Sequence, residues 1–132
     1  GWKLNPGKTN ALIYFGGNAE DVSRNLPSFS AAFSDHALYF LHYRGFGGSS
    51  GSPTEEAIQR DALGLFDEVY ARHPQVTLVG RSLGSGVAVR LASDAAALPE
   101  AGSTCRIAFD PADAQIFEPL AAPAAASFGE KP

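Results

Sequence analysis

The stretch Val76-Thr77-Leu78-Val79-Gly80-Arg81-Ser82-Leu83-Gly84 decides how this chain folds. Its first four residues form an apolar run that predicts a buried strand, and the apolar segment 87–92 predicts a helix after it. A strand that turns sharply into a helix around Gly-x-Ser-x-Gly is a nucleophile elbow. The glycines allow the helix to pass close to the strand while the serine backbone is strained. Ser82 is therefore the candidate nucleophile, with the helix N-terminus behind it to stabilise negative charge.

Three other apolar runs predict buried strands, at 11–15, 37–41 and 106–109. Between the first two, apolar side chains at spacings of three and four predict a helix over 19–33, which Pro27 kinks or divides. The helix after the elbow is expected to run to about residue 97.

A capping motif at residues 52–55 predicts another helix between the second strand and the elbow strand. Ser52 is the expected N-cap, Pro53 suits the first helical position, and Glu55 completes a capping box. The helix is expected to end near 72–74, where proline follows.

Alternation of strands and helices, with each strand apolar throughout, predicts an α/β fold: a parallel sheet in three layers, with helices on both faces. Functional groups in such folds gather beyond the carboxyl ends of the strands, where Asn18, Arg44 and Ser82 fall. Residues 1–118 are expected to form one domain. Residues 119–132, rich in Ala and Pro without periodicity, are expected to be a loosely held tail.

Composition limits the partners of the chain. Its 132 residues carry a net charge of −4 with no basic cluster, so neither nucleic acid nor an anionic membrane is an expected partner. No apolar run reaches the length of a membrane span. The single cysteine, Cys105, lies in an apolar run and is interpreted as a buried structural thiol. The compartment stays open, with a cytoplasmic location preferred to a secreted one.

No cluster of His, Cys and carboxylate residues has ligand spacing, so neither a metal nor an organic cofactor is implied. A nucleotide-binding Rossmann-like domain is the least favoured interpretation. The run 45–50 lacks the third glycine of G-x-G-x-x-G, and the chain contains no complete G-x-x-x-x-G-K-[ST] motif, because Trp2 stands where Gly7-Lys8-Thr9 would need its first glycine.

Three motifs, at 15–21, 43–49 and 80–86, appear in an order that resembles the α/β-hydrolase superfamily, with bacterial serine esterases and peptidase-like hydrolases the most similar members. The resemblance covers residues 10 to 95. It implies that Ser82 attacks the carbonyl of a small acyl ester or thioester and forms an acyl-enzyme. It also implies an oxyanion hole made by the backbone N–H groups of Leu83 and Asn18. Many members have histidine where Gly16 stands in this chain.

The resemblance leaves the general base in question. The family order is serine, then acid, then histidine, yet His36, His42 and His73 all precede Ser82. His36 and His73 are expected at the opposite end of the sheet. His42 lies at the same end of the sheet as Ser82, on a strand two positions from the elbow strand, and is the candidate base. The alternative is that His42 only forms local hydrogen bonds at the end of its strand.

Candidates for the acid follow the fourth strand. Asp110 or Asp113 would occupy that position, and Asp110-Pro111 also reads as an ordinary turn opener.

Compared with the family, the chain looks short at both ends. It opens on Gly1 and contains no methionine, which suggests a processed or excised piece. A fragment, a natural minimal hydrolase and an inactive hydrolase-like module that acts by assembly all remain open. A four-stranded sheet would leave apolar edges at 38–41 and 106–109, which predicts a homo-oligomer.

Overall fold

The computed structural model describes residues 1–46, 48–93 and 105–109. Its sheet has the order β1-β3-β2-β4-β5. The strands are β1 (Trp2–Leu4), β2 (Asn10–Phe15), β3 (His36–Leu41), β4 (Gln75–Gly80) and β5 (Cys105–Phe109). The four strands predicted from apolar runs are present, and they pair in parallel as β3-β2-β4-β5. The predicted α/β class is confirmed.

Strand β1 corrects two expectations. It pairs antiparallel with β3, with Trp2 opposite Phe40 and Leu4 opposite Leu38, so the sheet is mixed and not wholly parallel. The same pairing covers the edge at 38–41 that was expected to lie open. Among the described strands β5 remains at an edge, and oligomerisation through it stays a prediction.

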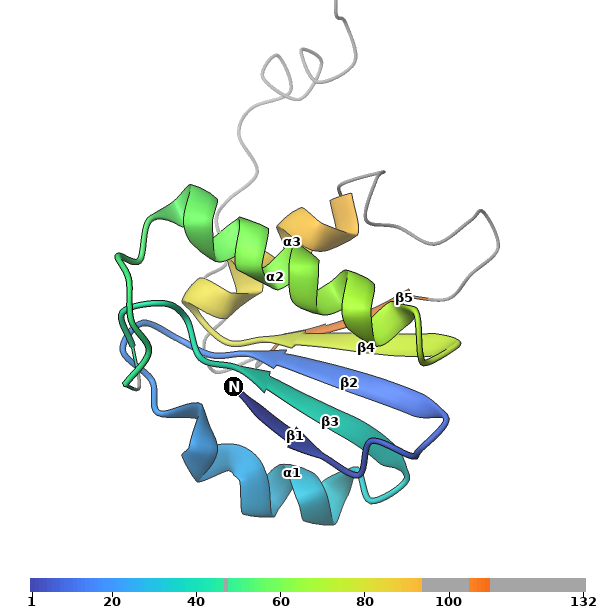
Figure 1. Cartoon of the computed structure of the whole chain (residues 1–132). Coiled ribbons are helices and arrows are strands. Elements are labelled where there is room, and N and C mark those ends of the chain that lie inside the picture. The colour runs from blue at the N-terminus through green and yellow to red at the C-terminus, as the bar shows by residue number, and fades with distance from the viewer. Residues whose placement is uncertain (47, 94–104, 110–132) are drawn as a thin grey trace, which may run out of the picture.

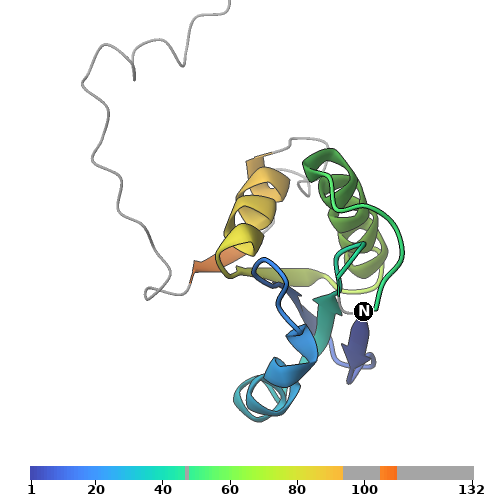
Figure 2. The same ribbon diagram turned by 90° about the vertical axis from the view of Figure 1, so that its left-hand side faces the viewer.

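Helices cover both faces of the sheet, as predicted (Figures 1 and 2). A short 3₁₀ turn, η1 (Val22–Asn25), and α1 (Leu26–Ala32) lie on one face, and α2 (Glu55–Tyr70) and α3 (Leu83–Ser93) lie side by side on the other. Alternate residues of β2 point to the two faces: Ile13 belongs to the core under α2 and α3, and Leu12 to the core under α1. Burial on both faces explains why the strands are apolar throughout.

The starts of α1 and α2 are set by proline and by an N-cap residue. Pro27 stands in the first turn of α1, directly after η1, so the expected division of the 19–33 segment is confirmed. The expected N-cap at Ser52 is wrong. Helix α2 begins two residues later, because extended Thr54 accepts the Ala57 N–H on its hydroxyl oxygen (3.3 Å) and performs the capping itself.

A buried histidine joins the far end of the sheet to α2. His73 is 3% exposed, and its Nδ1 donates to the main-chain carbonyl of Lys8 (2.9 Å). Since a carbonyl can only accept, the proton of the neutral ring lies on Nδ1, and in that tautomer Nε2 accepts from the hydroxyl of Tyr39 (2.8 Å). His73 and His36, which lies at the start of β3 beside Asp35, thus have structural partners away from the elbow.

We expect His73→Phe to lower the free energy of unfolding by about 1–3 kcal/mol, because it leaves the buried Tyr39 hydroxyl without its acceptor. Urea denaturation followed by circular dichroism measures this. His36→Phe is the matched control, since its partner Asp35 is 77% exposed and loses little. Equal midpoints for the two variants would contradict the assigned role of His73.

Within the described residues, no helix combines the length and apolar character needed to cross a membrane.

Candidate active site

Ser82 occupies the turn between β4 and α3 with a φ of 51°. This left-handed conformation is costly for a residue with a side chain and is sustained by the surrounding structure. The N–H of Gly84 bonds to the carbonyl of Arg81 and that of Ser85 to the carbonyl of Ser82, both at 2.9 Å. The hydroxyl of Ser85 also donates to the carbonyl of Gly80 (3.1 Å). The elbow is thus a closed hydrogen-bonded turn with Ser82 at its apex.

Close backbone approach explains the two elbow glycines. A Cβ on Gly84 would collide with the main-chain oxygen of Phe15, and one on Gly80 would collide with the backbone of Gly84. The first turn of α3 therefore packs directly on the ends of β2 and β4. No other residue type fits at either position without displacing backbone.

The loop after β2, residues 16–18, lies beside the elbow. The N–H of Arg81 bonds to the carbonyl of Phe15 (3.0 Å), and a Cβ on Gly17 would stand 3.5 Å from the Cβ of Ser82. Asn18 and Leu83 line one cavity. The structure thus brings together the 16–18 loop, Ser82 and Leu83, the three places that the sequence assigned to nucleophile and oxyanion hole.

The cavity beside Leu83 has a volume of about 730 Å³, within the range of small-molecule sites. It opens between the N-terminal ends of α2 and α3. Leu83 itself is 40% exposed. The walls are mainly apolar and carry four polar side chains, those of Asn18, Glu55, Gln59 and Arg90; the other lining residues are Phe46, Pro53, Ile58, Leu83, Gly86 and Val87.

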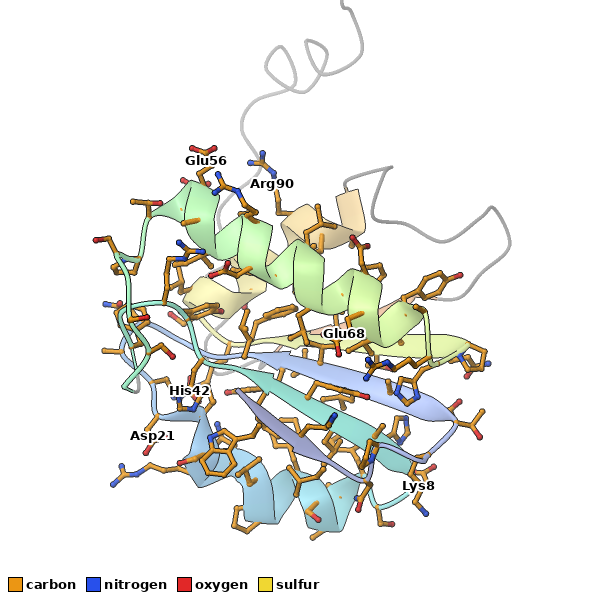
Figure 3. All side chains as sticks on the ribbon, in the orientation of Figure 1. Lys8, Asp21, His42, Glu56, Glu68 and Arg90 are labelled. Atoms are coloured by element: carbon orange, nitrogen blue, oxygen red, sulfur yellow. The ribbon has the colours of Figure 1, made fainter. Side chains whose placement is uncertain are left out.

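His42 follows β3 at the predicted end of the sheet. Its Nε2 accepts a hydrogen bond from the indole Nε1 of Trp2 (3.1 Å), and the two rings meet edge to face. Hydrogen bonds from Ser23 hold the pKa of Asp21 below its ordinary value, and the nearby His42 acts in the same direction. Figure 3 shows His42 and Asp21 near one another, away from Glu56 and Arg90 on the opposite helices. The assignment of His42 as base stays a prediction.

The remaining predicted residues divide into two groups. Asp110 and Asp113 lie outside the described residues, as does the expected tail 119–132, and the acid stays unassigned. Arg44, expected with Asn18 and Ser82 beyond the carboxyl ends of the strands, forms a two-point ion pair with Asp61 of α2, at 2.8 and 2.5 Å. This pair holds the loop after β3 against α2. It raises the pKa of Arg44 and lowers that of Asp61.

Two residues beside the 16–18 loop were missed by the sequence analysis. The hydroxyl of buried Tyr43 donates to the carbonyl of Gly16 (3.0 Å), and burial raises its pKa well above the usual range. The carboxylate of Glu20 accepts the N–H of Gly17 (2.5 Å). In the sequence, Glu20 appears only as a charged residue shortly after the 16–18 loop, and such a pattern is also common at protein surfaces.

In the part of the chain that the structure describes, no three His, Cys, Asp or Glu side chains lie together to hold a metal ion.

Comparisons with known proteins point to one superfamily, although no family model matches the chain. The chain is 37% identical over 86 residues to protein ABHD12B of Homo sapiens, an alignment covering 61% of this chain and 24% of that protein. It is 38% identical over 86 residues to lysophosphatidylserine lipase ABHD12 of Xenopus tropicalis, covering 61% and 22%. It is 30% identical over 93 residues to protein bem46 of Schizosaccharomyces pombe, covering 65% and 31%.

A structural comparison agrees. The fold is similar to the crystal structure of MGS-M1, an α/β hydrolase enzyme from a Medee basin deep-sea metagenome library, with a TM-score of 0.51 and 19% identity, over 80% of this chain and 44% of that one. The strand order and strained elbow define the core of an α/β-hydrolase fold. The chain has the fold of an α/β hydrolase, and its sequence is similar to part of ABHD12B, ABHD12 and bem46. It spans about a quarter of the length of the curated relatives it matches.

Proposed function

We propose that this chain carries the nucleophile and oxyanion hole of a serine hydrolase that cleaves carboxylic esters through an acyl-enzyme on Ser82. The observation that carries the proposal is the strained Ser82 turn set beside the 16–18 loop and an apolar cavity. Strain at a serine in a turn of this kind is retained where it serves chemistry. The similarity to a lysophosphatidylserine lipase supports an ester with a long acyl chain, as does the apolar cavity.

The chemistry has two stages. Ser82 Oγ attacks the ester carbonyl carbon while a general base takes its proton, and the carbonyl oxygen becomes an oxyanion. The N–H groups of Leu83 and Asn18 donate to that oxyanion. When the C–O bond of the ester breaks, the alcohol leaves with the proton held by the base. Water then attacks the acyl-enzyme by the same route and frees the acid and Ser82.

The cavity suits the acyl chain of the substrate. Its position beside Leu83 lets an acyl chain extend from a carbonyl held at Ser82 into the space between α2 and α3. The apolar walls then bury the chain, at about 0.8 kcal/mol for each methylene group removed from water. A thioester with the same acyl group would fit the same geometry.

Incubation with a fluorophosphonate probe followed by intact-mass measurement tests the proposal. Such probes form a stable adduct only with an activated serine, so one adduct per chain is expected. Folded protein that stays unlabelled would contradict the hydrolase proposal. It would favour the second candidate, an inactive hydrolase-like module that acts by assembly through the β5 edge.

We propose His42 as the base and Asp110 or Asp113 as the acid, and a histidine variant tests the first assignment. His42→Ala is expected to slow labelling of Ser82 by about 100-fold or more, since general-base catalysis contributes 10²–10⁴-fold. His36→Ala is the control, with labelling unchanged. Wild-type labelling in His42→Ala would contradict the assignment and point to a base supplied by another segment or a second copy.

A further inference from the structure

Glu20 forms a hydrogen-bonded centre that the ester chemistry above does not use. Its Oε1 accepts from the hydroxyl of Tyr14 (2.8 Å) and the side-chain amide of Asn25 (2.6 Å). Its Oε2 accepts the N–H of Gly17 (2.5 Å) and lies 3.5 Å from Nη1 of Arg81. Only 12% of the side chain is exposed. One carboxylate therefore joins β2, the 16–18 loop, η1 and the elbow.

Two of these bonds fall on either side of Ser82. Gly17 belongs to the loop that faces the nucleophile, and Arg81 directly precedes it in the chain. Because the N–H of Gly17 is bound by Glu20, the loop's next N–H, that of Asn18, is left to serve an oxyanion. The carboxylate thus selects which donor the loop presents.

Packing around Glu20 fixes the loop in space as well as in orientation. A Cβ on Gly17 would stand 3.3 Å from Glu20 Oε2 and 3.5 Å from Ser82 Cβ, so the loop is held between carboxylate and nucleophile. A Cβ on Gly16 would meet Val22 Cγ1 at 2.6 Å and Glu20 Oε2 at 3.0 Å. A side chain at residue 16 would displace Val22, and one at residue 17 would crowd the Glu20 carboxylate.

The charge of Glu20 is compensated on every side. Burial acts to raise its pKa, but bonds from Gly17, Tyr14 and Asn25 and the charge of Arg81 outweigh it, and the pKa lies below its ordinary value. The carboxylate is therefore ionised at neutral pH. Arg81 offsets a negative charge that would otherwise oppose the developing oxyanion.

We propose that Glu20 is a positioning residue that holds the 16–18 loop against the elbow, so that the Asn18 N–H faces the oxyanion formed at Ser82. The proposal rests on the proposed function for its catalytic consequence. The structural part of the proposal, that Glu20 holds the 16–18 loop in place, can be measured independently of catalysis.

Glu20→Gln tests both halves, because it keeps the size of the side chain and removes its charge. The fluorophosphonate rate is separated into the maximal inactivation rate and the half-saturating probe concentration. Loss of an oxyanion donor lowers rates by about 10²–10³-fold, and a misplaced donor is expected to lower the maximal rate by about 10–100-fold. The half-saturating concentration is expected to stay within about twofold of wild type, because an oxyanion donor acts mainly in the transition state.

Glu68→Gln is the matched control, since Glu68 pairs with Arg72 at 3.0 Å on an exposed part of α2. It is expected to label like wild type. Two-dimensional ¹H–¹⁵N NMR supplies the independent readout: the Gly17 amide proton, bound to a carboxylate, is expected downfield in wild type and to move upfield in Glu20→Gln alone.

The outcomes separate the two proposals. An unlabelled wild type whose Gly17 resonance still depends on Glu20 overturns the proposed function and supports the loop-holding role. Labelling of Glu20→Gln at the wild-type maximal rate, or a Gly17 resonance unmoved by it, overturns the role of Glu20. If Glu20→Gln fails to fold, Glu20→Asp, which keeps the charge but draws the carboxylate back from the Gly17 N–H, replaces it with the same expected and overturning results.

Discussion

Ser82→Ala is expected to abolish the fluorophosphonate adduct and to lower ester hydrolysis by at least about 10³-fold, because the residual rate would come only from binding and the oxyanion hole. Alanine removes the hydroxyl oxygen that we propose as the nucleophile and leaves the left-handed turn otherwise intact. The hydrogen bonds of the elbow are all made by backbone and by Ser85, so the variant is expected to fold. Intact-mass measurement detects the loss of the adduct, and an assay with a chromogenic short-chain ester measures the loss of hydrolysis.

Ser34→Ala is the control for this experiment, since Ser34 is an exposed serine in the turn before β3. It is expected to label and hydrolyse like wild type. An adduct of full stoichiometry on Ser82→Ala would place the reactive serine elsewhere and remove the main support for the acyl-enzyme.

Gly84→Ala is expected to destabilise the fold by about 3 kcal/mol or more, at the upper end of the cost of forcing extra atoms into a packed interior. The new Cβ would strike the main-chain oxygens of Phe15 and Gly16, which cannot rotate away as a side chain can. Relief would require α3 to lift from the end of β2, and the 16–18 loop would move with it. Denaturant titration measures the loss.

Gly86→Ala, in the same helix, is the matched control. No atom lies within 4 Å of a Cβ placed on Gly86, so the change is expected to be neutral or to stabilise the protein by up to about 1 kcal/mol through helix propensity. Equal stability of the two variants would show that α3 does not pack on β2 as described.

The main features of the fold could be predicted because they depend on local patterns. The apolar runs at 11–15 and 76–79 are long enough to be read as strands, and the glycines of the elbow mark its close packing. Strand β1 could not be found in this way. It has three residues, Trp2 is half exposed, and its pairing with β3 joins segments that lie almost forty residues apart.

The candidate site was predicted only in part for a related reason. Ser82 and Leu83 belong to a contiguous motif, whereas Glu20 gains its role from Tyr14, Gly17, Asn25 and Arg81 together. That set exists only after β2 and β4 have paired. The N-cap of α2 was missed because Ser52 and Thr54 are both good caps, and the extended backbone at Thr54 decides between them.

The position of β2 between β3 and β4 has a kinetic consequence. Asn10 is in register with both His36 and Gln75, so the second pairing closes a loop of about 65 residues before the elbow can meet the 16–18 loop. Long-range parallel pairing of this kind slows folding. We therefore expect the turn that holds Ser82 to assemble in a late step, after residues 1–46 have formed their own core around β2 and β3.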